Sequence, residues 1–136
     1  MPLDLWENDQ PCVYDFGYRG ITRIISLTNW SDYETEIELP VDKPCHLYEY
    51  WSRVYLGIRD KYTAALAPHM TRLFFETDTG YPVCIVGSEC CLCPEIEQGI
   101  KDGVFSANLP KAGRYLLYQN GKVSELDAET TVRIRV

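Results

Sequence analysis

Apolar and polar residues alternate with a period of two along much of this 136-residue chain. The stretch YETEIEL shows the alternation best, because Tyr33, Ile37 and Leu39 fall on one face. Glu34, Glu36 and Glu38 fall on the other face. A period of two is typical of a half-buried β-strand, and no segment keeps a helical period for about ten residues.

The same pattern predicts a series of short strands. They are expected at Cys12–Tyr18, Ile21–Thr28, Tyr33–Leu39, Cys45–Trp51, Val54–Ile58, Tyr62–Leu66, His69–Glu76, Pro82–Val86, Val104–Leu109, Arg114–Gln119 and Thr131–Val136. Turn residues separate these ranges, among them Asn120-Gly121, which is a strong hairpin signal because both residues accept a positive φ. Many short strands joined by turns predict an all-β fold, an antiparallel two-sheet β-sandwich.

Composition and charge narrow the function. The 10 tyrosines favour strands. A formal net charge of −7 argues against a nucleic-acid partner or an anionic membrane, which both attract basic surfaces. No apolar run approaches the ~18 residues of a membrane span. The start, MPLDLWENDQ, shows no secretory signal, so the expected location is the cytoplasm.

The glutamates of YETEIEL have two interpretations. They could form a catalytic carboxylate cluster, or a solvated strand face whose charge discourages edge pairing. We favour the solvated face, because carboxylates on a half-exposed strand rarely act as acids or bases without burial that shifts a pKa.

The stretch ECCLCP places Cys90, Cys91 and Cys93 within four positions. A structural zinc site commonly takes two C-x-x-C pairs, and a second pair is missing here. In an extended strand, Cys91 and Cys93 would face away from Cys90, so the three thiols would not converge. Buried or incidental thiols are the favoured interpretation; a metal site and a redox pair or disulfide remain alternatives.

Three aromatic residues are the candidate carbohydrate-binding residues: Trp30, Tyr33 and Trp51. Trp30 and Tyr33 would form an outward row that stacks on sugar rings, and Trp51 would join them. The alternative is core packing, which is favoured for Trp51 and is as plausible as stacking for Trp30.

Motifs for catalysis are missing from the sequence. It contains no G-x-S-x-G, no H-E-x-x-H and no Gly-rich phosphate loop. His69 has no nucleophile motif beside it and is interpreted as a turn residue. We therefore predict no catalytic residues, no metal site and no cofactor.

Several segments together resemble melibiase-type, α-galactosidase-like glycoside hydrolases. PLDLWENDQPCVY, at Pro2–Tyr14, is similar to the exit from their catalytic (β/α)₈ barrel, and RIISLTNWSD, at Arg23–Asp32, is similar to the first strand of their C-terminal sandwich. LYEYWSRVYLG and LAPHMTRLF resemble paired strands of that domain, and the tail up to Gln98-Gly99 resembles a following segment.

The resemblance implies a non-catalytic C-terminal β-sandwich accessory domain. Residues 1–14 would be a barrel-exit or linker-like segment, and residues 11–136 a single β-sandwich domain. Its partner would be a catalytic (β/α)₈ barrel of a parent chain or of a separate subunit, and an exposed apolar patch would mark the docking face. The family's two catalytic aspartates belong to the barrel, so none is placed here.

Two other functions stay open. A free-standing carbohydrate-binding module would use the aromatic row. A small enzyme would need a deep polar pocket with two carboxylates roughly 5–9 Å apart, of which the sequence gives no hint.

Overall fold

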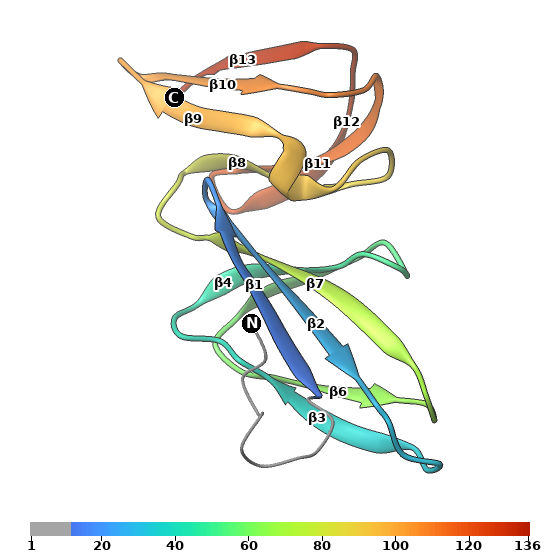
Figure 1. Ribbon diagram of the computed structural model, residues 1–136. Coiled ribbons are helices and arrows are strands. Elements are labelled where there is room, and N and C mark those ends of the chain that lie inside the picture. The colour runs from blue at the N-terminus through green and yellow to red at the C-terminus, as the bar shows by residue number, and fades with distance from the viewer. Residues whose placement is uncertain (1–11) are drawn as a thin grey trace.

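The computed structural model describes residues 12–136, and these form strands and one short 3₁₀-helix (Figure 1). All strand pairs are antiparallel, so the predicted all-β antiparallel sandwich is confirmed. No helix in this part of the chain is long and apolar enough to cross a membrane.

The first half of the chain builds an N-terminal sandwich of a five-stranded and a two-stranded sheet. The larger sheet has the order β1-β2-β7-β4-β5, and β3 pairs with β6. The strands are β1 (Val13–Arg19), β2 (Thr22–Thr28), β3 (Thr35–Leu39), β4 (Cys45–Glu49), β5 (Val54–Arg59), β6 (Tyr62–Leu66) and β7 (Thr71–Asp78).

The second half builds a C-terminal sandwich of two three-stranded sheets, with the orders β12-β11-β8 and β13-β10-β9. Its elements are β8 (Val83–Ser88), the 3₁₀-helix η1 (Cys93–Glu95), β9 (Glu97–Lys101), β10 (Val104–Asn108), β11 (Gly113–Gln119), β12 (Lys122–Ala128) and β13 (Thr131–Arg135).

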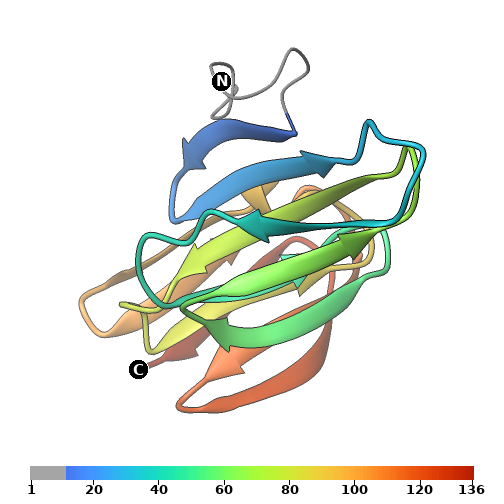
Figure 2. The ribbon, with the colours of Figure 1, turned by 90° about the horizontal axis from the view of Figure 1, so that it is seen from below.

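The four sheets stack as layers (Figure 1). Figure 2, seen from below, shows the β3–β6 pair in front of the five-stranded sheet, with β1 at that sheet's outer edge. The described residues thus hold four sheets where two were expected. Alternation along a strand tells which residues are buried, but it does not tell which sheet buries them.

Each sandwich has its own core. Side chains such as Ile25, Leu47 and Phe74 fill the space between the five-stranded sheet and the β3–β6 pair. Ile85 and Phe105 belong to the core between the two C-terminal sheets. Both cores are fully buried at these positions.

A third apolar cluster joins the two sandwiches, and we call it the central interface. Its buried members are Tyr48 of β4, Phe75 of β7 and Cys93 of η1, with Leu92 and Leu116 packed against them. The Tyr48 hydroxyl donates to the Ser88 carbonyl at 3.1 Å, so the hydroxyl is satisfied inside the apolar contact.

His46, on the same face of β4 as Tyr48, adds an aromatic contact between the sandwiches. Its ring lies 4.4 Å from that of Tyr118 of β11, and its Nδ1 is 2.9 Å from the Tyr55 hydroxyl. Burial lowers the pKa of His46 to about 4. The ring is therefore neutral near pH 7, and the stability it supports declines as pH falls from about 6.5 through about 4.

Local sequence explains most strands. In β3, Ile37 and Leu39 pack into the N-terminal core while Glu36 and Glu38 are exposed, as the alternation predicted. The Asn120-Gly121 turn has positive φ at both residues, 48° and 86°, and closes the β11–β12 hairpin.

Two strands, β9 and β12, lie outside the predicted ranges. β12 is an edge strand with only Leu126 and Ala128 partly buried against a core, so its sequence carries little alternation. In β9, the Gln98 side chain points inward. Its Oε1 accepts a hydrogen bond from the Ile85 amide, and its Nε2 donates one to the Ile85 carbonyl. A polar residue that pairs with backbone in this way gives no apolar signal.

Gly57 lies within β5, as the predicted strand Val54–Ile58 implied, with φ 88°, opposite a register shift between Leu47 and Tyr48. A β-bulge at this position uses the positive φ that glycine tolerates. The predicted barrel-exit segment of residues 1–14 lies mostly outside the described residues, and so does the predicted boundary at residue 11.

Tight packing at the central interface predicts that Gly87→Ala destabilises the protein. A Cβ on Gly87 of β8 would lie 2.6 Å from Cε2 of the Tyr48 ring and 3.0 Å from Cδ1 of Leu116. Because both side chains are held in apolar contact, we expect a loss of about 1–3 kcal/mol in the free energy of unfolding. Urea denaturation followed by tyrosine and tryptophan fluorescence measures it.

Gly99→Ala is the matched control for that substitution. Gly99 is also a strand glycine, yet its Cβ would meet nothing within 4 Å. Alanine should leave stability unchanged or raise it by roughly 0.5–1 kcal/mol. Equal losses for the two variants would contradict the packing assigned to Tyr48.

Candidate functional site

Three connections meet at one end of the five-stranded sheet. In the order β2-β7-β4, the end of β2, the start of β7 and the end of β4 are neighbours. The loop 29–34, the turn 50–53 and the loop 67–70 follow or precede these strand ends. We call this region the loop end.

Asn29 fastens the loop end from inside. This buried side chain donates through Nδ2 to the carbonyls of Tyr33, Leu66 and Ala67, at 2.7, 3.0 and 3.1 Å. Its Oδ1 accepts from the Ser31 amide and hydroxyl, at 3.0 and 2.7 Å. One amide therefore ties the β2–β3 loop to the β6–β7 loop.

All three predicted aromatic candidates lie in these connections, and all three are exposed: Trp30 by 47%, Tyr33 by 78% and Trp51 by 64%. Core packing, which the sequence favoured for Trp51, is therefore wrong. Their binding of sugar stays a prediction.

A pocket of about 250 Å³ opens beside Trp51, and neither Trp30 nor Tyr33 lines it. Its lining residues are Glu49, Trp51, Ser52, Met70, Thr71 and Arg72. Trp51 is held by its neighbour Tyr50, whose ring lies 5.1 Å away in an edge contact and in turn packs on Phe75 of the central interface. We call this cavity the Trp51 pocket.

Glu49 and Arg72 supply the polar part of the pocket, and sequence reasoning missed both. Glu49 is 2% exposed, and its Oε2 accepts from the Ser52 amide at 2.5 Å and from the Ser52 hydroxyl. In residues 12–136, buried Glu49 Oε1 and buried Arg72 Nε have no hydrogen-bond partner. The signal that could have revealed this site is Glu49 itself, a charged residue at the end of β4, whose other residues are buried as well.

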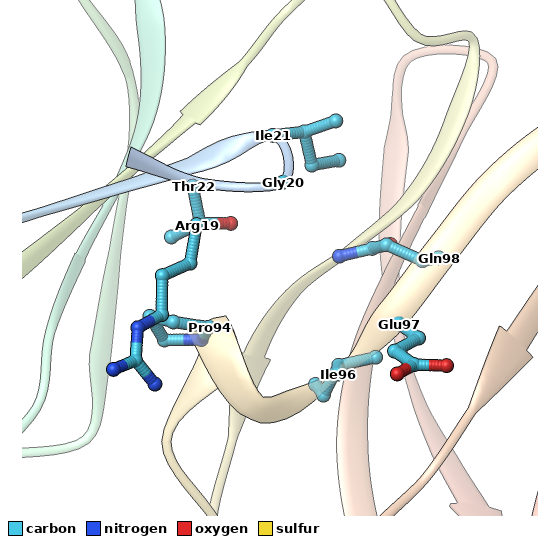
Figure 3. A pocket seen from close by; sticks show the side chains of 8 residues that line it. All are labelled: Arg19, Gly20, Ile21, Thr22, Pro94, Ile96, Glu97 and Gln98. Atoms are coloured by element: carbon cyan, nitrogen blue, oxygen red, sulfur yellow. The ribbon is translucent and has the colours of Figure 1, made fainter. Parts of the chain in front are cut away.

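A second pocket, of about 290 Å³, lies between the β1–β2 hairpin and the η1–β9 segment (Figure 3). Its deeper polar groups already have partners: Gln98 binds the Ile85 backbone, and Thr22 contacts the Thr77 hydroxyl at 3.3 Å. Its charged residues, Arg19 and Glu97, are exposed. This pocket therefore offers a ligand less than the Trp51 pocket does.

An ion cluster surrounds the buried Arg23 on the core-facing side of the five-stranded sheet. The guanidinium contacts Asp15 at 2.7 Å, Asp42 at 3.2 Å and Glu76 at 3.4 Å. Burial raises the pKa of Glu76 to about 7, against the opposing attraction of Arg23. The Arg23 hydrogen bond lowers the pKa of Asp15. The cluster links β1, β2 and β7, and a structural role accounts for it.

The cysteines of ECCLCP do not form an extended strand. The Ser88 hydroxyl accepts from the amides of Cys90 and Cys91, which bends the chain before η1. Cys91 then enters the C-terminal core and Cys93 the central interface, both as free thiols. Burial raises the pKa of both, which suppresses the reactive thiolate.

No metal-binding arrangement is found in the described part of the chain, where no three or more His, Cys, Asp or Glu side chains converge. His69 has φ 57° in the β6–β7 loop, and its Nε2 contacts Asp32 of the β2–β3 loop at 2.8 Å. This turn histidine adds a second connection between the two loops.

Comparison with known proteins assigns no family. No family model matches the chain, and no curated protein matches it. Among solved structures, the chain is similar to Arthrobacter globiformis T6 isomalto-dextranase complexed with panose, at 12% identity and a TM-score of 0.45. The match covers 90% of this chain and 32% of that one, so this chain spans about a third of that enzyme's length. The resemblance to α-galactosidase-like enzymes stays a prediction.

Asn29→Ala tests how the loop end is fastened. It removes the donor to three carbonyls, and the buried Leu66 carbonyl then loses this partner. We expect the free energy of unfolding to fall by about 1–3 kcal/mol in urea denaturation. Asn108→Ala, at an exposed position of β10, should change it by less than about 0.5 kcal/mol. Equal losses in the free energy of unfolding for the two variants would contradict the role assigned to the Asn29 hydrogen bonds.

Glu76→Gln tests the charge state of the Arg23 cluster. A carboxyl whose pKa is raised in the folded state contributes its stability below its ordinary pKa of 4.5, and this is lost as pH rises through about 7. Relative to the unsubstituted protein, Glu76→Gln should therefore gain stability between pH 5 and pH 8. Thermal unfolding at the two pH values measures the gain.

The control for this pH effect is Glu36→Gln, which removes a charge from the exposed face of β3. Its stability relative to the unsubstituted protein should change little between the two pH values. A Glu76→Gln difference that does not vary with pH would contradict the raised pKa.

Proposed function

We propose that this chain is a non-catalytic accessory domain of an α-galactosidase-like glycoside hydrolase, and that its β1 edge packs against a catalytic (β/α)₈ barrel. The barrel belongs to a parent chain or to a separate subunit. The observation that carries this proposal is a pair of exposed rings in contact on β1.

Tyr14 and Phe16 form that pair, exposed by 41% and 57%. The rings of Tyr14 and Phe16 lie 4.6 Å apart. A β-bulge between Asp15 and Gly17 places Phe16 as the extra residue of the strand, and the Asp15 carboxylate accepts from the Gly17 amide at 2.7 Å. Bulges of this kind redirect a side chain out of the regular pattern.

This ring pair lies on β1, an outer edge strand of the five-stranded sheet (Figure 2). An exposed cluster of large rings on a strand edge invites a partner surface. Burying a phenylalanine side chain contributes roughly 1.5–3 kcal/mol. β1 begins at Val13, within the segment Pro2–Tyr14 whose sequence resembles a barrel exit, and for this reason we place the barrel at the β1 edge.

Photocrosslinking in the source cells tests the proposal. The chain, carrying photoreactive benzoyl-phenylalanine in place of Phe16, is irradiated and its products are identified by mass spectrometry. We expect a covalent link to the barrel of a glycoside hydrolase, within the same polypeptide or in a second one. Benzoyl-phenylalanine in place of Tyr33, which lies at the loop end, should give no crosslink to a barrel.

The outcome against the proposal is equally definite. An endogenous product of 15.7 kDa that yields no barrel crosslink from position 16 would mean that the domain acts alone. A free-standing carbohydrate-binding module is then the better description. The exposure of Trp30, Tyr33 and Trp51 at one end favours that second candidate.

A further inference from the structure

We propose that the Trp51 pocket binds one neutral pyranose unit, held between Trp51 and the Glu49–Arg72 pair. This inference does not depend on barrel docking, because the pocket lies at the loop end and contains no residue of β1. Trp30 and Tyr33 lie outside it, so it also differs from the aromatic row predicted from the sequence.

The position of the two charged groups follows from strand register. Glu49 of β4 pairs with Phe74 of β7, so Arg72 stands two residues away along β7 on the same face. Glu49 is pinned by Ser52 through one carboxylate oxygen, while Oε1 keeps its accepting capacity. Arg72 keeps Nε as a donor. Two residues that line the pocket thus hold one acceptor and one donor without a hydrogen-bond partner among the described residues.

The charges of this pair indicate the chemical class of the ligand. A carboxylate accepts from a hydroxyl and a guanidinium donates to one, so adjacent hydroxyls satisfy both groups. A phosphate or carboxylate ligand would gain from Arg72 and be repelled by Glu49. An ammonium ligand would be attracted by Glu49 and repelled by Arg72. A neutral polyol fits the pair best.

The apolar part of the pocket indicates that the polyol is a ring. Trp51 is anchored by Tyr50 yet 64% exposed, and Met70 faces the same cavity. An indole provides a flat apolar surface for the C–H face of a sugar, while Ser52 and Thr71 provide hydroxyls at the rim. The volume of about 250 Å³ is below the roughly 300–1,000 Å³ of pockets for larger ligands, so it suits one ring.

Titration of the complete 136-residue chain with methyl pyranosides tests the proposal by ¹H–¹⁵N NMR. The neutral probes are methyl α-galactopyranoside and methyl α-glucopyranoside; the charged probes are glucuronate and glucosamine. We expect saturable shifts of the Trp51 indole and the Arg72 Nε–H signals with at least one neutral probe. Each charged probe should bind at least about fivefold more weakly than that neutral probe.

Substitutions separate the pocket from the rest of the loop end. Trp51→Ala and Glu49→Gln should each weaken binding at least tenfold, whereas Trp30→Ala and Tyr33→Ala should change it less than twofold. Arg72→Lys supplies a second pocket variant that keeps the charge but removes the Nε donor, and it should also weaken binding. Dispersed amide spectra establish that each variant is folded.

Three results would overturn the inference. The first is an unchanged spectrum with both neutral pyranosides up to about 100 mM. The second is binding that Trp30→Ala abolishes while Trp51→Ala leaves it intact, which would return the site to the aromatic row. The third is tighter binding of a charged probe, which would show that one member of the Glu49–Arg72 pair acts alone.

Discussion

The central interface decides what kind of molecule this is. Each sandwich has its own core, and without the contact of Tyr48, Phe75 and Cys93 with Leu92 and Leu116 they would be two small domains joined at residues 79–82. Small domains bury a lower fraction of their surface and are marginally stable. Packing the two sheets together therefore adds stability to both halves and sets their orientation.

Both proposed surfaces depend on the central interface through the strands that pack in it. β7 carries Phe75 in the interface, Arg72 in the Trp51 pocket and Glu76 in the Arg23 cluster. The Trp51 ring packs on Tyr50, and the Tyr50 ring packs on Phe75. Asp15, between the exposed Tyr14 and Phe16 of β1, is tied inward by its salt bridge to Arg23. A rigid centre thus presents two separate surfaces, one apolar edge and one mixed pocket.

Much of the fold could be predicted from the sequence, because strands that bury one face alternate visibly. β3 and β6 show this, and so does the Asn120-Gly121 hairpin. β9 and β12 were not predicted. β9 turns Gln98 inward to pair with the backbone, and β12 is an exposed edge strand. The stacking of four sheets escaped as well, since fully buried strands such as β4 and β8 do not reveal their partners.

The candidate site was predictable only in part. Aromatic residues in turn-like sequence were visible at Trp30 and Trp51. The proximity of Glu49 and Arg72 was not visible, because strand register alone brings them to one face of neighbouring strands.

Native-state amide hydrogen exchange tests the central claim most directly, by comparing β2 in the N-terminal sandwich with β10 in the C-terminal one. Both are interior strands of their sheets. If the central interface makes the two sandwiches one cooperative unit, the slowest amides of both strands exchange with the same free energy of opening. A free energy for β10 that is several kcal/mol below that of β2 would contradict the claim, because the C-terminal sandwich would then open while the N-terminal one stays folded.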